Sequence, residues 1–284
     1  MSSALRDQLS SFRDKAFARG FSADEVRHWE DVVRPCVRLA RDGDGPVVGR
    51  FGGPLLLPAE VPDPATPYVA TIDLAALPAG STDLPLPPDG TLLLFAIVED
   101  DCDYADAGSA VHVPAGTAVA ERDRHSSWWS TVDEYREKIE RFPQGPLRAT
   151  PDLSLPRYCE EHYSADLHWE AAWPTRSDEL RELLRDARAG IAGWGTLQLG
   201  GFASEEVVDL HDPLDAVVEQ ATRAAADGKV DFAVSEEPAD WVLLADWHTD
   251  ISGWEGASVH WALQRKDLEE RRFDRVFATY YWNP

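Results

Sequence analysis

Cysteine is scarce in this sequence, and so are the features that would carry the chain across or into a membrane. Three cysteines, Cys36, Cys102 and Cys159, lie far apart in 284 residues. So few cysteines, odd in number, exclude a disulfide framework and favour a reducing compartment. The N-terminal residues lack the basic segment and apolar run of a signal peptide, and no run approaches the roughly 20 apolar residues that span a bilayer. We therefore expect a cytoplasmic protein without a membrane segment.

Basic residues are also few, with 27 Lys and Arg against 51 Asp and Glu and a formal net charge of −24. Nucleic acids and anionic membranes are bound by clustered Lys and Arg, so the composition argues against both as partners. A basic protein or a small-molecule ligand stays open as a partner. The alternative is that the charge only keeps the protein soluble and monomeric. Monomer and homodimer are both compatible with this composition.

Local patterns predict a mixture of helices and short strands. The 44% hydrophobic content is enough for a substantial core, and 20 prolines favour short strands joined by ordered loops. Ser22 and Glu25 form a capping-box pattern at the second of two amphipathic helices within residues 3–34. We expect a β-hairpin over 36–51, strands at 68–74, 91–98 (central), 111–113 (edge), 196–199, 241–250 and 257–263, and helices at 131–142, 177–187 and 212–228.

The order of these features repeats. Gly52-Gly53 and Gly200-Gly201 are each followed by a connection, an apolar strand, a Gly-containing turn and a second apolar strand. Because repeated order indicates internal duplication, we predict an α+β fold with antiparallel sheets, a pseudo-twofold duplication and helices packed on the outside. The predicted organisation is a single compact domain, 1–284, with repeat halves at 36–120 and 190–284 and a helical connection at 121–189.

The stretch 241–263 carries the principal candidate site. Side chains alternate along a strand, so Asp246, His248 and Asp250 are expected on one face, and Ser258 and His260 share a face of the returning strand. Carboxylate and imidazole are ligands of Zn, Mn or Fe, and a His beside a carboxylate is also a general-base pair. Asp246, His248 and Asp250 are therefore candidate ligands of a divalent metal. The alternative is a solvated polar strand face, common in a chain rich in Asp.

The repeat suggests further candidates. Thr71 and Asp73 fall where Asp246 and His248 fall in the second half, so both pairs would line one cleft if the halves face each other. Trp254 belongs to a set of loop tryptophans that could present an aromatic binding surface or pack as loop cores. That set also contains Trp128, Trp129, Trp169, Trp173 and Trp282.

Two other metal patterns are incomplete. The acidic run 99–106 lacks the spacing and closing Glu of an EF-hand, which favours a solvated loop. Cys159 and His162, with His168 later, lack the second Cys pair that a structural zinc site needs. Cys159 paired with a His as a nucleophile is equally undetermined, since a free Cys is usually buried.

Several motifs together resemble the YwqG-like family of uncharacterised bacterial proteins. They are Phe51-Gly-Gly-Pro54, Leu57-Pro58, the 68–74 strand, Pro87 to Phe95, Leu199-Gly-Gly-Phe202, Asp240 to Leu244, and Lys266-Asp-Leu268 followed by Phe273. The resemblance covers residue 36 to the C-terminus. It implies an α+β fold with pseudo-twofold repetition and no established activity. It also implies a Gln in each repeat strand, where this chain carries Thr71 and Asp246.

Two function hypotheses follow. No nucleophile, phosphate-binding or cofactor motif is present, which favours a binding or interaction protein with a cleft between its repeat halves. The alternative is a metal-dependent hydrolase or oxygenase that uses Asp246, His248, Asp250 and His260.

Overall fold

The chain begins with two helices whose boundaries follow from their capping residues. The computed structural model describes residues 1–98, 107–125, 127–155, 177–188, 195–203 and 213–282. Helix α1 spans Ser3–Ala18 and α2 spans Ala23–Val32. Ser22 and Glu25 make both hydrogen bonds of the predicted capping box. The later helices are α3 (Asp133–Glu140), α4 (Ser177–Arg185), α5 (Pro213–Ala226) and α6 (Arg265–Glu269).

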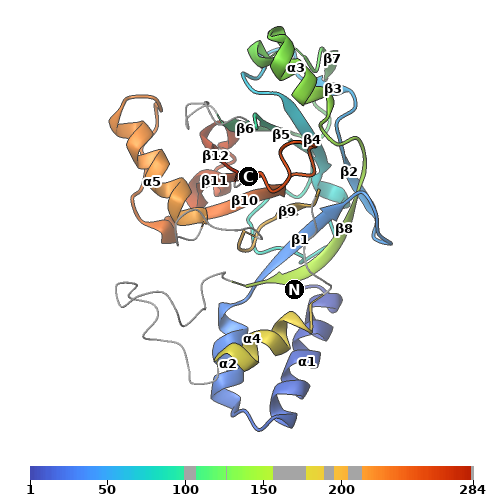
Figure 1. Cartoon of the computed structure of the whole chain (residues 1–284), viewed down its shortest axis with the longest axis vertical. Helices are drawn as coiled ribbons and strands as arrows, with labels where there is room; N and C mark the ends of the chain where they lie inside the picture. Colours follow the sequence, from blue (N-terminus) through green and yellow to red (C-terminus); the bar gives the residue numbers. More distant parts are fainter. Residues whose placement is uncertain (99–106, 126, 156–176, 189–194, 204–212, 283–284) are drawn as a thin grey trace.

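Ten strands form one antiparallel sheet in the order β12-β11-β10-β9-β1-β8-β2-β4-β5-β6 (Figure 1). The combination of this sheet with separate helices confirms the α+β class. The strands are β1 (Arg34–Ala40), β2 (Val47–Phe51), β4 (Tyr68–Asp73), β5 (Thr91–Ala96), β6 (Gly108–Val113), β8 (Gly145–Ser154), β9 (Leu197–Leu199), β10 (Trp241–His248), β11 (Ser258–Gln264) and β12 (Phe277–Tyr281). Two further strands, β3 (Leu55–Leu57) and β7 (Ala120–Arg122), pair separately.

The predicted hairpin over 36–51 is wrong. Strands β1 and β2 are not paired with each other, because β8 lies between them and pairs with both. The Gly-rich turn that suggested a hairpin is itself held by β8, since Arg148 donates to the carbonyl of Gly45 at 3.0 Å. A turn signal reports only the local chain reversal, and the partners of the two strands are set by a segment about a hundred residues away.

Strand β5 is not central as predicted from its continuous apolar run, but next to the end of the sheet. Both of its faces are nevertheless buried. Leu92 and Leu94 belong to the main core, while Leu93 and Phe95 pack with Leu55 and other residues of the small β3–β7 region. A second apolar layer therefore accounts for the run that a central position would otherwise explain.

The sheet curls until its two ends meet. Trp261 on β11 is completely buried and donates from Nε1 to the carbonyl of Phe95 on β5 at 3.0 Å. Gly108 on β6 packs so tightly there that a Cβ would lie 3.0 Å from the Cβ of Ala278 on β12. The apolar core fills the inside of this curl.

Helices α1, α2 and α4 pack together at one end of the sheet, below β1 and β8 in Figure 1. Their own small core includes Phe12 and Trp29 and reaches the sheet through Leu153 of β8. Helix α5 covers β10, β11 and β12 through a separate cluster that contains Val217, Trp241 and Phe277. No helix in the described part of the chain is long and apolar enough to span a bilayer.

Candidate functional site

Four of the polar residues predicted on β10 and β11 do meet. Asp246 lies directly opposite His260, and His248 lies opposite Ser258, so all four side chains share one face. His260 Nε2 is 3.4 Å from Asp246 Oδ1. The same row continues to Gln198 on β9, which is opposite Asp246.

This polar row is buried. Asp246 is fully buried and His260 is 3% exposed, with His248, Ser258 and Gln198 also buried. The solvated strand face that the sequence left as an alternative is therefore wrong. Gln198 is oriented by the Gly200-Gly201 turn, since its Nε2 donates to the carbonyls of Gly200 and Phe202 at 3.0 and 2.6 Å. These side chains therefore form a packed, buried polar layer.

The other predicted site residues lie apart from this row. Asp250 follows β10, is exposed, and lies 3.4 Å from Arg41. Trp254 is 9% exposed and stacks on Trp282 at a ring-centroid distance of 4.4 Å, with the ammonium of Lys138 4.6 Å from its ring. Trp254 is thus a loop-core residue and not an exposed aromatic. Of the remaining tryptophans, Trp169 and Trp173, like the side chain of Trp128, lie outside the described residues.

In the first half, Thr71 shares a hydrogen bond with the hydroxyl of Tyr68. Asp73 is exposed and accepts from the backbone of Ala75, capping the short 3-10 helix Leu74–Ala76. Both residues therefore have local structural roles. The two pockets described below are lined by neither this pair nor the Asp246 row.

Metal ligation was a further prediction for the second-half strands. Among the described residues, no group of three or more His, Cys, Asp and Glu side chains is arranged to hold a metal ion. The acidic run 99–106 and the Cys159, His162 and His168 set lie outside the described residues.

A buried ionic cluster on β1 and β8 was not predicted from the sequence. Asp152 is fully buried, with Arg38 Nη2 2.5 Å and Arg188 Nε 3.6 Å from its Oδ2. Cys36 lies opposite Asp152 in the register. Burial, and secondarily the charge of Asp152, raises the pKa of the Cys36 thiol to about 12. A thiol with so high a pKa stays protonated at physiological pH, which disfavours a nucleophilic role for Cys36.

A groove of about 470 Å³ lies beside β6. Its first wall is the loop 61–65, which is held from behind by Arg122 of β7. The Nη2 of Arg122 donates to the carbonyls of Ala59 and Val61 at 3.2 and 3.4 Å, and its Nη1 lies 3.4 Å from Asp63 Oδ1. One guanidinium with several acceptors fixes the loop, so this wall is preformed.

The opposite wall consists of Arg271, Phe273 and Asp274, and it is held by a second ionic cluster. Asp267 is 2% exposed and accepts from Arg272 Nε at 2.8 Å and from Arg275 Nη1 at 3.1 Å. Arg271 adopts a left-handed backbone conformation with φ 60°, which turns the chain at the end of α6 toward the groove.

Strand β6 forms the floor of the groove through Ser109, Ala110, Val111 and His112. The ring of His112 packs on Phe273 at a centroid distance of 5.2 Å. Its Nε2 is 3.1 Å from the carbonyl of Asp89, and because a carbonyl can only accept, this nitrogen carries the proton. In the neutral ring, Nδ1 is then the acceptor. The groove thus combines apolar side chains from both walls and the floor with a small number of polar groups.

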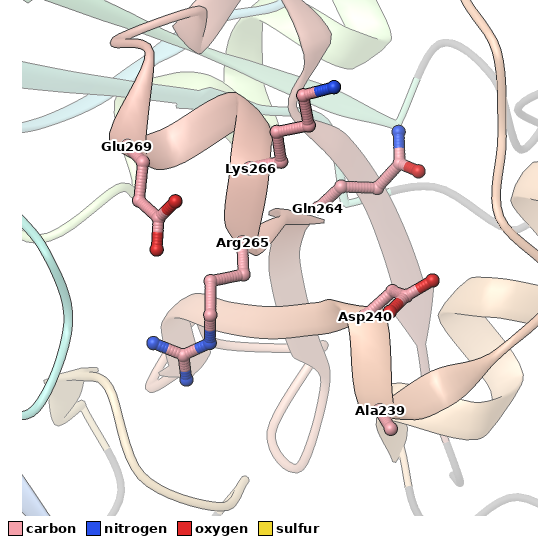
Figure 2. Close-up of a pocket in the computed structure, with 6 residues that line it drawn as sticks. All are labelled: Ala239, Asp240, Gln264, Arg265, Lys266 and Glu269. Atoms are coloured by element: carbon pink, nitrogen blue, oxygen red, sulfur yellow. The ribbon is translucent and has the colours of Figure 1, made fainter.

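A second, smaller pocket of about 330 Å³ lies at the start of α6. Figure 2 shows Arg265 and Lys266 extending in opposite directions, with the carboxylates of Asp240 and Glu269 on different sides. Charges of both signs surround this pocket without converging on one point. Of these two, the groove beside β6 is the better-formed candidate site, because both of its walls are fixed from behind and its volume is larger.

Partial signals for the groove were present in the sequence. Val61-Pro-Asp-Pro64 is a proline-rich loop, and Asp267 and Phe273 are among the motif residues of the family resemblance. Nothing in the sequence brings these segments to the same strand, which is why the groove was not predicted.

A family model described as "Domain of unknown function (DUF1963)" matches residues 49–282. A comparison with curated proteins found no match.

Proposed function

This chain belongs to the DUF1963 family, a domain of unknown function, and we propose that it is a binding protein whose ligand occupies the groove beside β6. The observation that carries the proposal is the preformation of both walls, by Arg122 on one side and by Asp267 on the other. A preformed site loses little conformational entropy when its ligand binds, so such ordering favours affinity.

The lining indicates the kind of ligand. Proline, valine and phenylalanine side chains provide apolar area, while His112, Arg271 and Asp274 provide polar contacts. Such a combination is typical of sites that orient a small molecule or a short peptide segment. The net charge of −24 additionally favours a basic partner, which it would attract over long range.

Filling the groove is expected to abolish binding. We would screen neutral apolar fragments and short linear peptides by thermal shift against the parent and against Val111→Trp, which places an indole in the groove. A ligand at about 100 times its Kd stabilises the native state by about 2.7 kcal/mol, which raises Tm by several degrees. Hits are expected to stabilise the parent but not Val111→Trp.

The matched control is Val119→Trp, the same substitution at an exposed valine outside the groove. We expect the fragments and peptides that stabilise the parent to stabilise Val119→Trp to the same extent. Hits that stabilise all three proteins equally would place binding elsewhere and contradict the proposal.

A metal-dependent hydrolase or oxygenase is the second candidate. The specific observation in its favour is the meeting of Asp246 and His260 at 3.4 Å, with His248 on the same face. We rank it below the groove because the described residues supply no group of three ligands.

Elemental analysis of protein purified without chelator or metal affinity resin tests this second candidate. On the groove proposal we expect much less than one equivalent of Zn, Mn or Fe in the parent. About one equivalent, lost in His248→Ala while Asp250→Ala retains it, would favour the enzyme instead.

We also infer that the sheet arose by internal duplication. Outward from the central β1–β8 pair, the strands follow the same order on both sides, β9-β10-β11-β12 and β2-β4-β5-β6. The Gly pairs after β2 and β9 both have left-handed φ values, 58° and 86° at Gly52 and Gly53, and 69° and 73° at Gly200 and Gly201. These correspondences support the predicted halves and the assignment to YwqG-like proteins, for which a cytoplasmic location is our expectation.

A further inference from the structure

The main-chain groups of β6 decide what the floor of the groove can bind. Among the described residues, strand β6 ends the sheet and pairs with β5 alone. The direction of the main-chain groups of β5 is given by two hydrogen bonds at its C-terminal end, from its last residue and from the residue after it. Ala96 donates to Pro67 at 2.9 Å, toward β4, whereas Ile97 donates to Ala107 at 3.0 Å, toward β6. Successive residues of a strand point to opposite edges, so odd-numbered residues of β5 bond to β6.

The register of the β5–β6 pairing shows which residues of β6 face β5. Leu93 is odd-numbered and lies opposite Val111, so Val111 returns hydrogen bonds to β5. Ala110 and His112 therefore direct their N–H and C=O groups away from β5, toward the groove. Within the described part of the chain, no backbone hydrogen bond uses these outward groups. The floor thus offers a short row of main-chain donors and acceptors.

The two walls stand on opposite faces of β6. Val111 packs with Val61 in the cluster beneath the first wall. Ala110 belongs to the main core on the other face, where His112 packs on Phe273 of the second wall. A groove with a strand edge at its floor and one wall above each face can accept an extended segment along that edge.

Resting on the proposed function of the groove, we propose that its occupant is an extended peptide segment that adds to β6 as a further strand. The segment would form main-chain hydrogen bonds with Ala110 and His112. Its side chains would alternate between the Val61 wall and the Phe273 wall. This recognition mode obtains affinity from the main chain and specificity from alternate side chains.

Charge identifies the class of segment. Asp274 is exposed on the second wall, which also carries the exposed Arg271, and has no ion pair among the described residues, while the net charge of the chain is −24. Sheet edges that must stay unpaired are commonly guarded by charged residues, particularly Lys, yet β6 reads Gly-Ser-Ala-Val-His-Val. We therefore assign to the segment apolar residues facing Val61 and Lys or Arg facing Asp274.

The test begins with selection of short linear peptides from a random displayed library on the parent protein. Selection on Val111→Trp removes sequences that bind elsewhere. The enriched peptides are expected to contain Lys or Arg between alternating apolar residues, and Asp274→Asn is expected to weaken them. Each selected peptide is then synthesised with a single N-methyl group at successive positions.

N-methylation removes one donor and blocks one edge of the peptide. If the peptide adds as a strand, affinity falls by about tenfold or more at every second position and changes little in between. Amide exchange at Ala110 and His112 should slow on binding, while exchange at Val111, already bonded to β5, changes little. Val119→Trp should bind the peptides as the parent does.

The outcomes separate this inference from the function it rests on. Peptides that need an open groove but tolerate N-methylation without alternation would refute strand addition and leave the groove as a binding site. The same conclusion follows if no peptide is enriched while groove-dependent small molecules are found. If the selection step on Val111→Trp removes every enriched peptide, the peptides bind elsewhere and the groove itself is contradicted. Slowed exchange at Ala110 and His112 in a concentration-dependent dimer, without peptide, would assign the edge to a second copy and overturn the proposal. Enrichment of acidic peptides would overturn the assigned charge.

Discussion

Replacing Asp152 by alanine is expected to lower the free energy of unfolding by about 3–5 kcal/mol. The carboxylate is fully buried, and Arg38, which is 2.5 Å away, is itself 8% exposed in its side chain. Alanine would leave the Arg38 guanidinium inside the protein without its closest countercharge, and would also remove the nearby anion from Arg188. An unpaired buried charge costs far more than the pair contributes. Urea-induced unfolding followed by tryptophan fluorescence measures the difference.

Two variants show whether the cause is the unpaired charge. Asp250→Ala removes an exposed carboxylate that also lies near an arginine, and we expect a change of less than about 1 kcal/mol. In Arg38→Met/Asp152→Leu the closest ion pair is replaced by apolar groups, and part of the lost stability should return, because only the more exposed Arg188 then lacks Asp152. If Asp152→Ala is as stable as the parent, water must reach the Arg38 guanidinium, which would contradict its burial.

The second large effect is expected at Trp261, which joins the two ends of the curled sheet. We expect Trp261→Ala to lower the free energy of unfolding by about 3–5 kcal/mol, because it leaves a cavity in a fully buried position. Trp261→Phe keeps an aromatic ring and loses the hydrogen bond to the Phe95 carbonyl, so a loss of about 1–3 kcal/mol is expected from that group.

The same urea titration measures both variants, with Val119→Trp as a surface reference. Amide exchange adds a positional readout. Exchange should accelerate in β6 and β12, where Gly108 and Ala278 meet, more than in β1 or β8. Uniform acceleration throughout the sheet would indicate that Trp261 contributes core packing alone and does not hold the ends together.

Some of this structure could be predicted because its signals are local. The capping box at Ser22 and Glu25 fixes the start of α2, and the alternation in β10 predicted correctly that Asp246 and His248 share a face. The prediction of the hairpin was wrong because it also relied on local signals alone. A turn is encoded in a few residues, whereas the insertion of β8 between β1 and β2 depends on complementary surfaces distant in the chain.

The candidate site also has a part that could be predicted from the sequence and a part that could not. Opposition of Asp246 and His260 follows from strand alternation once the two strands pair, but their burial depends on what covers the sheet. The groove requires the 61–65 loop, β6 and the 271–274 segment to meet, and no sequence period links them. Arg122 and Asp267, which hold its walls, appear in the sequence as ordinary charged residues.

The central position of β1 has a consequence for how the protein is made. Both neighbours of β1 come from the second half of the chain, with Arg34 paired to Ser154, 120 residues later, and Val37 paired to Leu199. In a nascent chain, one edge of β1 therefore stays open until residue 154 has been synthesised, and the other until residue 199. Long-range pairing of this kind folds slowly and leaves apolar strands available for aggregation. Neither half can acquire its native sheet alone, so we expect assembly to be post-translational and assisted by chaperones.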